Sequence, residues 1–84
     1  AGFIWDLFLD SRGRFWIAST SDGLWRLDES NTDSFEFIKY TVANGLTSNA
    51  ATAVTEDAFG RIYVGSWRGV DRLNPDTGQI ENFT

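Results

Sequence analysis

Few of the side chains that usually carry out chemistry are present in this sequence. The 84 residues contain no Cys and no His. Thiolate and Ser–His–Asp mechanisms are therefore excluded within the chain, and the commonest general base and metal ligand are missing. The adjacent carboxylates Glu56 and Asp57 lie near the end of a strand-like segment. Because neighbouring strand residues point to opposite faces, these two cannot converge on one substrate atom. We therefore predict no catalytic residue.

An acidic cluster is the one pattern that could attract a cation. Asp28, Glu29 and Asp33 share a loop-like stretch, but their spacing matches no EF-hand loop. A solvated turn is the simpler interpretation. The glycines are scattered singly, so no phosphate-binding loop is indicated. We expect no metal site and no cofactor.

Ligand binding has three candidates: Trp67, Arg68 and Trp25. Trp67 and Arg68 are neighbours in a predicted turn, and an aromatic ring beside Arg suits stacking on a sugar ring or docking on a partner. The alternative for each tryptophan is packing against neighbouring structure, since aromatic side chains are mostly buried. Packing is the stronger interpretation for Trp25.

The charge balance restricts the partners. Asp and Glu number 12 against 7 Lys and Arg, a net charge of -5. An acidic chain repels phosphate backbones, so no nucleic acid partner is expected. No cluster of basic residues and no apolar run of about 20 residues is present, so this segment is not expected to contact a membrane. The sequence lacks Met and opens at Ala1 directly before a strand-like segment, which indicates a piece of a longer protein.

An internal repeat organises the chain. Residues 10–19, DSRGRFWIAS, align with residues 57–66, DAFGRIYVGS. After a one-residue gap Gly23 aligns with Gly69 and Arg26 with Arg72. After a second gap Tyr40-Thr41 aligns with Phe83-Thr84. Each copy contains four segments rich in β-branched and aromatic residues. They span about 3–9, 14–20, 24–28 and 35–41 in the first copy, and 50–56, 61–67, 69–73 and 79–84 in the second.

The turns between these segments have recognisable chemistry. An Asp side chain can accept bonds from the turn backbone, and a Gly three residues later can adopt positive φ. The predicted turn residues are Asp10, Gly13, Gly23, Asp57, Gly60 and Gly69. We expect Trp16 and Tyr63 to be core aromatics, and Arg26 and Arg72 to pack along or pair with a neighbouring sheet.

The second segment of each copy is apolar at consecutive positions, which predicts sheets covered on both faces. A four-stranded repeat of 40–50 residues is typical of a β-propeller blade. The sequence thus predicts an all-β fold of two four-stranded antiparallel propeller blades. Blade 1 would span residues 1–43, a linker 44–49 and blade 2 residues 50–84. A two-sheet sandwich is the alternative, and it covers only one face of each sheet.

Residues 10–28, DSRGRFWIASTSDGLWRLD, resemble the two-component regulator propeller repeat, and NGLTSN at 44–49 is similar to its inter-blade signature. The second copy is a looser match, with Tyr63 in place of Trp and Trp67 where a small residue is usual. The resemblance implies a periplasmic or extracellular sensor propeller of a bacterial two-component protein. It also implies a small-molecule or carbohydrate ligand.

Two blades cannot close a ring, because propellers have about four to eight. Other blades, from a longer chain or from further copies, are therefore the expected partners. The first functional hypothesis is a non-catalytic sensor module that binds a ligand. The alternative is a self-associating fragment that forms a closed ring as an interaction scaffold, and a propeller lyase or hydrolase is a third hypothesis.

Overall fold

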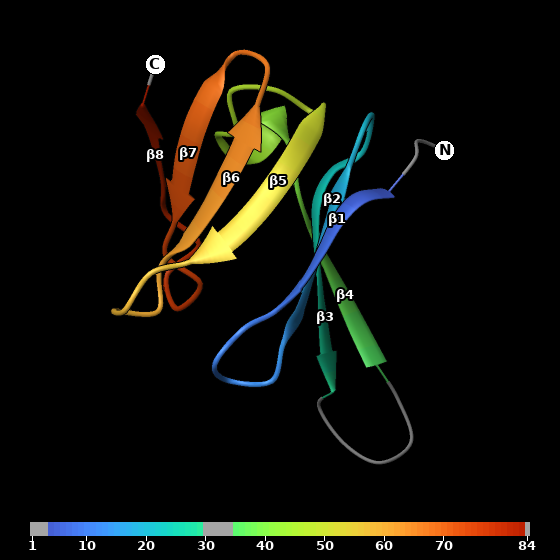
Figure 1. Cartoon of the computed structure of the whole chain (residues 1–84), viewed down its shortest axis with the longest axis vertical. Helices are drawn as coiled ribbons and strands as arrows, with labels where there is room; N and C mark the ends of the chain where they lie inside the picture. Colours follow the sequence, from blue (N-terminus) through green and yellow to red (C-terminus); the bar gives the residue numbers. More distant parts are fainter. Residues whose placement is uncertain (1–3, 30–34, 84) are drawn as a thin grey trace.

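The computed structural model describes residues 4–29 and 35–83. Eight strands form two four-stranded antiparallel sheets, with no α-helix in the described part of the chain (Figure 1). The first sheet contains β1 (Ile4–Leu9), β2 (Phe15–Ser19), β3 (Gly23–Glu29) and β4 (Phe35–Tyr40), in that order. The second contains β5 (Ala51–Glu56), β6 (Ile62–Ser66), β7 (Gly69–Leu73) and β8 (Ile80–Phe83), also in order. The predicted all-β blade architecture is confirmed.

The repeat in the sequence reappears as a repeat in register. In both sheets the first strand carries an irregularity near its start, between Ile4 and Asp6 in β1 and between Ala51 and Ala53 in β5. The second and third strands pair without interruption, so that Trp16 lies opposite Arg26 and Tyr63 opposite Arg72. Equivalent residues therefore occupy equivalent places in the two sheets.

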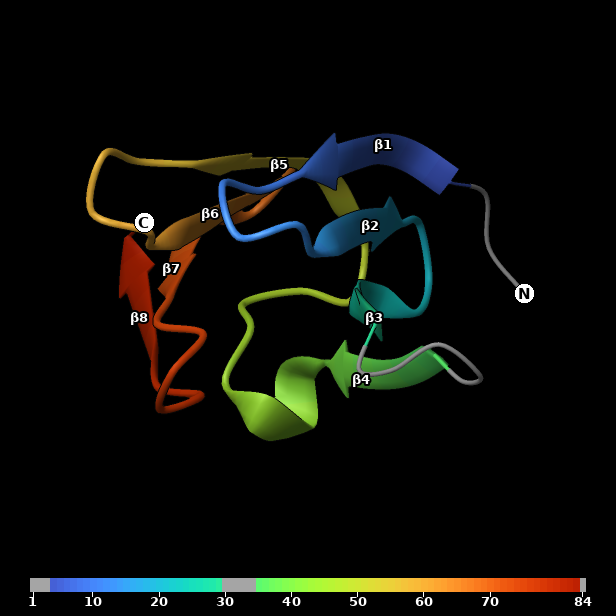
Figure 2. The ribbon, with the colours of Figure 1, turned by 90° about the horizontal axis from the view of Figure 1, so that it is seen from below.

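The two sheets pack face to face, and β1 and β5 contact each other along one side of the molecule. Figure 2 shows these two strands side by side, whereas the short 3-10 helix η1 (Val42–Asn44) lies at the other side, near β4 and β8. Each sheet is a complete meander made from one continuous stretch of chain. Sheets that fan out from adjacent first strands are typical of propeller blades.

One hydrophobic core fills the space between the sheets. Trp16 and Leu24 come from the first sheet and are fully buried, as are Ile62 and Leu73 from the second. The ring of Trp16 stacks on that of Tyr40, with centroids 6.0 Å apart. The complete buried apolar set is Trp16, Ala18, Leu24, Tyr40, Leu46, Ala51, Val54, Ile62, Val64 and Leu73. Alternation along the strands explains the strand members of the set, because every second side chain points to the same face, and Leu46 is added by the segment that connects the two sheets.

The expectation that both faces of the second strand are covered is wrong for this two-sheet unit. In β2, Trp16 and Ala18 are buried, but Phe15 is exposed and Ile17 is half-buried. Tyr63, expected in the core with Trp16, is also only half-buried. The reason is geometric: two stacked sheets share a single interface, so each sheet has one face left open.

Gly23 is required where β3 begins. Its φ is +78°, a left-handed value that L side chains rarely adopt. A Cβ atom at this position would also collide with the backbone carbonyl oxygen of Tyr40. Its N–H donates to the carbonyl of Asn49 at 2.8 Å, so the turn is tied to the segment that leads into the second sheet.

Candidate functional site

An aspartate organises the turn between β1 and β2. One carboxylate oxygen of Asp10 accepts hydrogen bonds from the backbone N–H groups of Arg12 and Arg14, each at 2.9 Å. The other oxygen accepts from Arg14 Nε and from the Trp16 indole, each at 2.7 Å. Asp10 is only 4% exposed. Burial raises the pKa of this carboxyl, but the bonds from Trp16, from the two backbone N–H groups and from the Arg14 side chain outweigh it and lower the pKa.

The β5–β6 turn repeats this arrangement in a more exposed setting. Asp57 accepts from the backbone N–H groups of Phe59 and Arg61 at 2.8 and 3.0 Å. It also accepts from Arg61 Nε at 2.8 Å and from the Tyr63 hydroxyl at 3.1 Å. Desolvation opposes ionisation here too, but the hydrogen bonds lower the pKa of Asp57 to about 2. Gly60 has a φ of +82° and closes the turn.

The equivalent turns of the two sheets lie at the same end of the molecule, which we call the hairpin rim (residues 10–14, 57–61 and 74–79). Two interactions across the sheets tie this rim together. Glu56 accepts from the backbone N–H and the hydroxyl of Ser11 at 2.9 and 2.8 Å. Arg12 Nη1 donates to Asp76 at 3.1 Å. The carboxylate of Glu56 therefore serves the contact between the sheets, whereas that of Asp57 serves its own turn.

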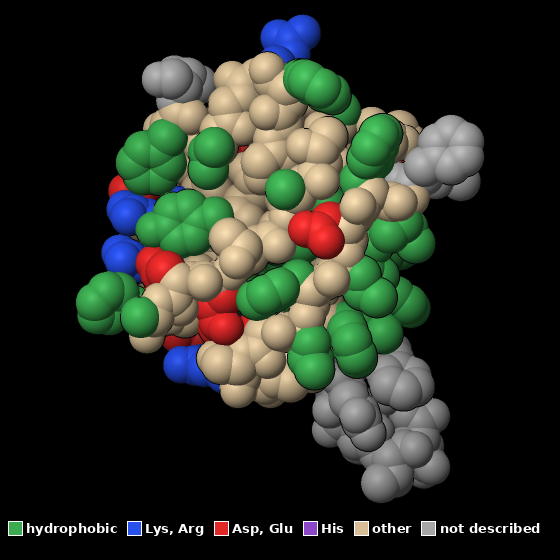
Figure 3. All heavy atoms as spheres, in the orientation of Figure 1, with side chains coloured by type: hydrophobic (Ala, Val, Ile, Leu, Met, Phe, Trp, Pro, Cys, Tyr) green, Lys and Arg blue, Asp and Glu red, His purple; other side chains and the backbone are tan. Residues whose placement is uncertain are grey.

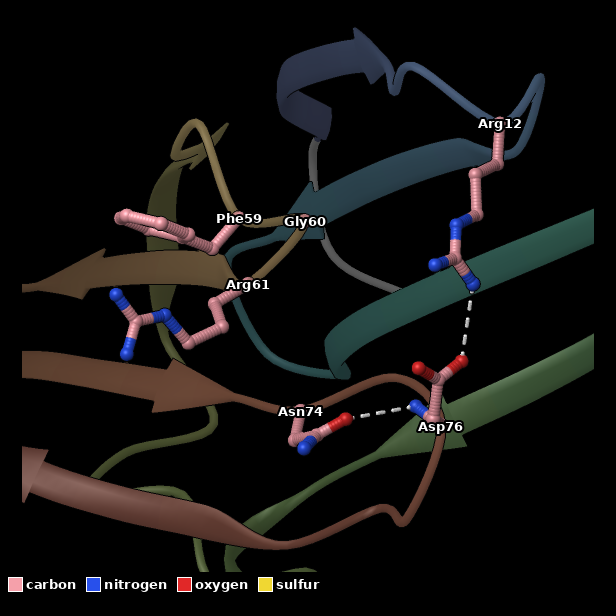
Figure 4. Close-up of a pocket in the computed structure, with 6 residues that line it drawn as sticks. All are labelled: Arg12, Phe59, Gly60, Arg61, Asn74 and Asp76. Atoms are coloured by element: carbon pink, nitrogen blue, oxygen red, sulfur yellow. Dashed lines mark hydrogen bonds and ion pairs between the residues drawn. The ribbon is translucent and has the colours of Figure 1, made fainter.

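A pocket opens at the hairpin rim between the two sheets. It is shallow and is lined by Arg12, Phe59, Gly60, Arg61, Asn74 and Asp76 (Figure 4). Phe59 is 80% exposed, and the Arg61 guanidinium carbon lies 5.2 Å from its ring centroid. On the opposite side the Arg12–Asp76 ion pair is open to solvent. An aromatic face, two guanidinium groups and amide and carboxylate oxygens thus surround one open space.

The predicted ligand residues lie elsewhere. Trp67 and Arg68 form the β6–β7 turn at the opposite end of the sheets, and Trp67 is 88% exposed. Trp25 lies in β3 on the face of the first sheet that points away from the second, and its ring contacts Phe37 edge-on at 5.6 Å. In the described part of the chain, no hydrogen bond or ring contact joins Trp25 to Trp67. The structure does not bring these candidates together.

The remaining predicted residues are accounted for by the fold. Asp10 and Gly13 lie in the β1–β2 turn, Asp57 and Gly60 in the β5–β6 turn, and Gly23 and Gly69 begin β3 and β7. The side chains of Asp28 and Glu29, and the whole of Asp33, lie outside the described part. Within residues 4–29 and 35–83, no three acidic side chains gather as a metal site would require. No helix in the same ranges is long and apolar enough to cross a membrane.

The two repeated arginines have different partners. Arg26 donates to the Tyr40 hydroxyl at 3.2 Å and to the carbonyl of Pro75 in the second sheet at 3.4 Å. Arg72 instead pairs with Glu81 of its own sheet at 2.7 Å, and this bond raises the pKa of Arg72. Only Arg26 has a second sheet against its face.

A buried carboxylate holds the segment between the sheets. Asp71 is 1% exposed and accepts from the backbone N–H and the hydroxyl of Thr47 at 2.9 and 2.7 Å. It also accepts from the Asn82 amide at 2.7 Å, and Asn82 donates to the carbonyl of Gly45 at 2.9 Å. We call Asp71 and Asn82 the linker clasp. The clasp places Leu46, which is buried, in the core.

Comparison with known proteins identifies the repeat. A search of curated proteins finds no match to this chain. The family model of the two-component regulator propeller matches residues 1–21 and 45–68, more than half of the sequence. The matched stretches cover the β1–β2 unit and the β5–β6 unit, which are the equivalent halves of the two sheets. This chain belongs to the two-component regulator propeller family, and its two sheets are two of that family's blades.

Proposed function

We propose that the chain is a non-catalytic, ligand-binding part of a sensor propeller in a two-component signalling protein, and that the ligand contacts the hairpin-rim pocket. The observation that carries the proposal is the composition of this pocket, which takes its walls from turns of both blades. A ligand bound there touches both blades at once. It can therefore favour one relative orientation of the blades over another.

The chemistry of the pocket favours a carbohydrate. An exposed aromatic ring such as Phe59 offers an apolar face for stacking, and guanidinium groups bind oxygen-rich or anionic ligands in a fixed geometry. The exposed Arg12–Asp76 pair contributes only about 0–1 kcal/mol to stability. A ligand carboxylate can therefore replace Asp76 as the partner of Arg12 at little cost. We infer a small carbohydrate, with acidic sugars bound best.

A non-catalytic role is supported by the use of the aspartates. The carboxylates of Asp10, Asp57 and Asp71 are each committed to three or four structural hydrogen bonds. A carboxylate held in this way is not available to take or give a proton at a reacting atom. The family resemblance further supports a periplasmic or extracellular setting, where a carbohydrate signal would be met.

The test is a titration of the chain with neutral and uronic-acid oligosaccharides, in which binding is monitored by calorimetry and by the amide signals of the NMR spectrum. We expect saturable binding, with the largest shifts at residues 57–61. Phe59→Ala should raise the Kd about tenfold, which corresponds to ~1.4 kcal/mol of lost contact free energy. Val42→Ala, an exposed apolar change at the opposite end of the sheets, is the matched control and should leave the Kd unchanged.

A second variant separates this pocket from the site predicted at Trp67. If Trp67→Ala weakens binding and Phe59→Ala does not, the ligand binds beside Trp67 and Arg68, and the hairpin-rim assignment is wrong. If no oligosaccharide of either class gives saturable binding, the carbohydrate assignment itself fails.

A further inference from the structure

The first blade has an open face that is almost entirely apolar. Its strands alternate, so the side chains that do not point to the second blade gather on the opposite side. This first open face consists of Leu7, Leu9, Phe15, Ile17, Trp25, Leu27 and Phe37, together with one charged residue, Lys39, which lies opposite Trp25. Leu7, Leu9 and Phe37 are 59%, 56% and 58% exposed. Figure 3 shows hydrophobic side chains gathered along the side of the molecule formed by this sheet. An apolar surface of this kind marks an interaction site.

The second blade has an open face of a different kind. It carries Tyr63, Val70, Arg72 and Phe83, which the repeat aligns with Trp16, Leu24, Arg26 and Tyr40. In both blades an Arg lies over an aromatic ring, at 5.8 Å for Arg26 and Trp16 and at 5.1 Å for Arg72 and Phe83. This second open face therefore repeats the chemistry of the face that the first blade already buries.

The correspondence also holds in the other direction. Ile17 and Leu27 of the first open face align with Val64 and Leu73, which the second blade buries against the first. Each open face is thus the repeat counterpart of one half of the interface inside the chain. The packing of blade 1 on blade 2 within the chain is therefore a template for a contact between molecules. In that contact the second open face of one molecule would pack on the first open face of another.

One difference between the two blades indicates what kind of partner covers the first open face. The linker clasp of blade 2, Asp71 and Asn82, holds the chain that arrives from blade 1. At the same places blade 1 has Trp25 and Lys39, and the Lys39 ammonium lies 5.3 Å from the Trp25 ring centroid. Neither side chain can accept the backbone N–H bond that Thr47 donates to Asp71. The first open face is therefore suited to a blade that arrives without a covalent linker.

We propose that the first open face binds the second open face of another copy of this chain, head to tail, and that successive copies close a ring. Such a contact is heterologous, because it joins two different surfaces, and it closes only at a fixed number of copies. Propellers have about four to eight blades, so two to four copies complete the ring.

The first test is the mass of the chain in solution, by sedimentation velocity and native mass spectrometry over a range of concentrations. We expect one closed species of two to four copies of the 9.4 kDa chain. Leu7→Lys places a charge on the first open face and Val70→Lys places one on the second. Each should reduce the mass to that of a single chain. Val42→Lys, a matched apolar-to-Lys change away from both faces, should leave the ring intact.

Mixing the two disrupted variants distinguishes head-to-tail pairing from symmetric pairing. The Leu7→Lys chain keeps its second open face, and the Val70→Lys chain keeps its first. An equimolar mixture should therefore form a 1:1 dimer and nothing larger. Circular dichroism of each variant confirms that the blades remain folded, since both residues are exposed in the single chain.

Three outcomes would overturn the proposal. The wild-type chain could remain a folded monomer at high concentration. Its oligomers could survive Leu7→Lys and Val70→Lys together. Alternatively, Leu7→Lys alone could abolish association while Val70→Lys has no effect and the mixture gives no dimer that contains both variants, which is the signature of first open faces pairing with each other.

Discussion

Replacing Asp10 with Asn tests whether one buried carboxylate organises the first blade. Asn is nearly isosteric, but only one of its two terminal atoms can accept hydrogen bonds. If the Asn oxygen keeps the backbone N–H groups of Arg12 and Arg14, its amide nitrogen faces Arg14 Nε and the Trp16 indole, which are themselves donors. The substitution therefore sets donor against donor inside the core.

The magnitude follows from which donors lose their acceptor. The Trp16 indole is fully buried, and an unsatisfied buried donor costs about 1–3 kcal/mol. The Arg14 side chain is 15% exposed, so water can replace part of its charge-assisted bond. The total expected loss is about 2–5 kcal/mol, a large share of the ~4–13 kcal/mol expected for a domain of this length.

The assay is equilibrium urea unfolding followed by far-UV circular dichroism, on proteins held monomeric by Leu7→Lys. The repeat supplies a matched control in Asp57→Asn. Four donors at the equivalent positions surround Asp57, but its side chain is 20% exposed, and its fourth donor is the Tyr63 hydroxyl, which can rotate to another partner. We expect Asp57→Asn to shift the midpoint distinctly less than Asp10→Asn.

Two results would refute this reasoning. Equal midpoint shifts for the two variants would show that burial does not set the cost. A free energy of unfolding for Asp10→Asn within about 0.5 kcal/mol of the parent would show that the hydrogen bonds to Trp16 and Arg14 contribute little. In the parent, the Trp16 indole N–H should exchange slowly with solvent, and in Asp10→Asn its exchange should be much faster.

Three further predictions concern other parts of the fold. Because the folded pKa of Asp57 is lowered to about 2, its stabilisation is fully present above the unfolded value near about 4 and is lost as the pH falls toward about 2. Urea midpoints measured from pH 7 to pH 2 should therefore fall in this window, and less steeply in Asp57→Asn. Gly23→Ala should destabilise far more than Gly13→Ala in the same assay. Both glycines have positive φ, but only a Cβ at Gly23 meets backbone, and equal losses would contradict this account. Asp71→Ala should cost about 2–5 kcal/mol and speed the amide exchange of Thr47, whereas unchanged exchange would show that the linker clasp does not hold this segment.

Much of the architecture could be predicted from the repeat. Each strand of β-branched and aromatic residues lies within two residues of its expected bounds, because alternation and turn chemistry are local properties. The pocket was missed, although a signal for it was present. Arg12 and Phe59 occupy the same place in the two copies and differ in type, as Trp67 differs from its counterpart Thr20.

Local chemistry determined the blades, and the stacking of the blades decided the rest. The sequence alone places an Asp at the start of each first turn, with an Arg and an aromatic residue at fixed positions after it in the chain. These sequence separations are short, so the hydrogen bonds from the Arg and the aromatic residue to the Asp form within one hairpin. The pocket joins Arg12 to Asp76 across 64 positions of chain, and the open faces exist only because two sheets share one interface. Contacts of that range depend on how the sheets pack, which no local pattern specifies.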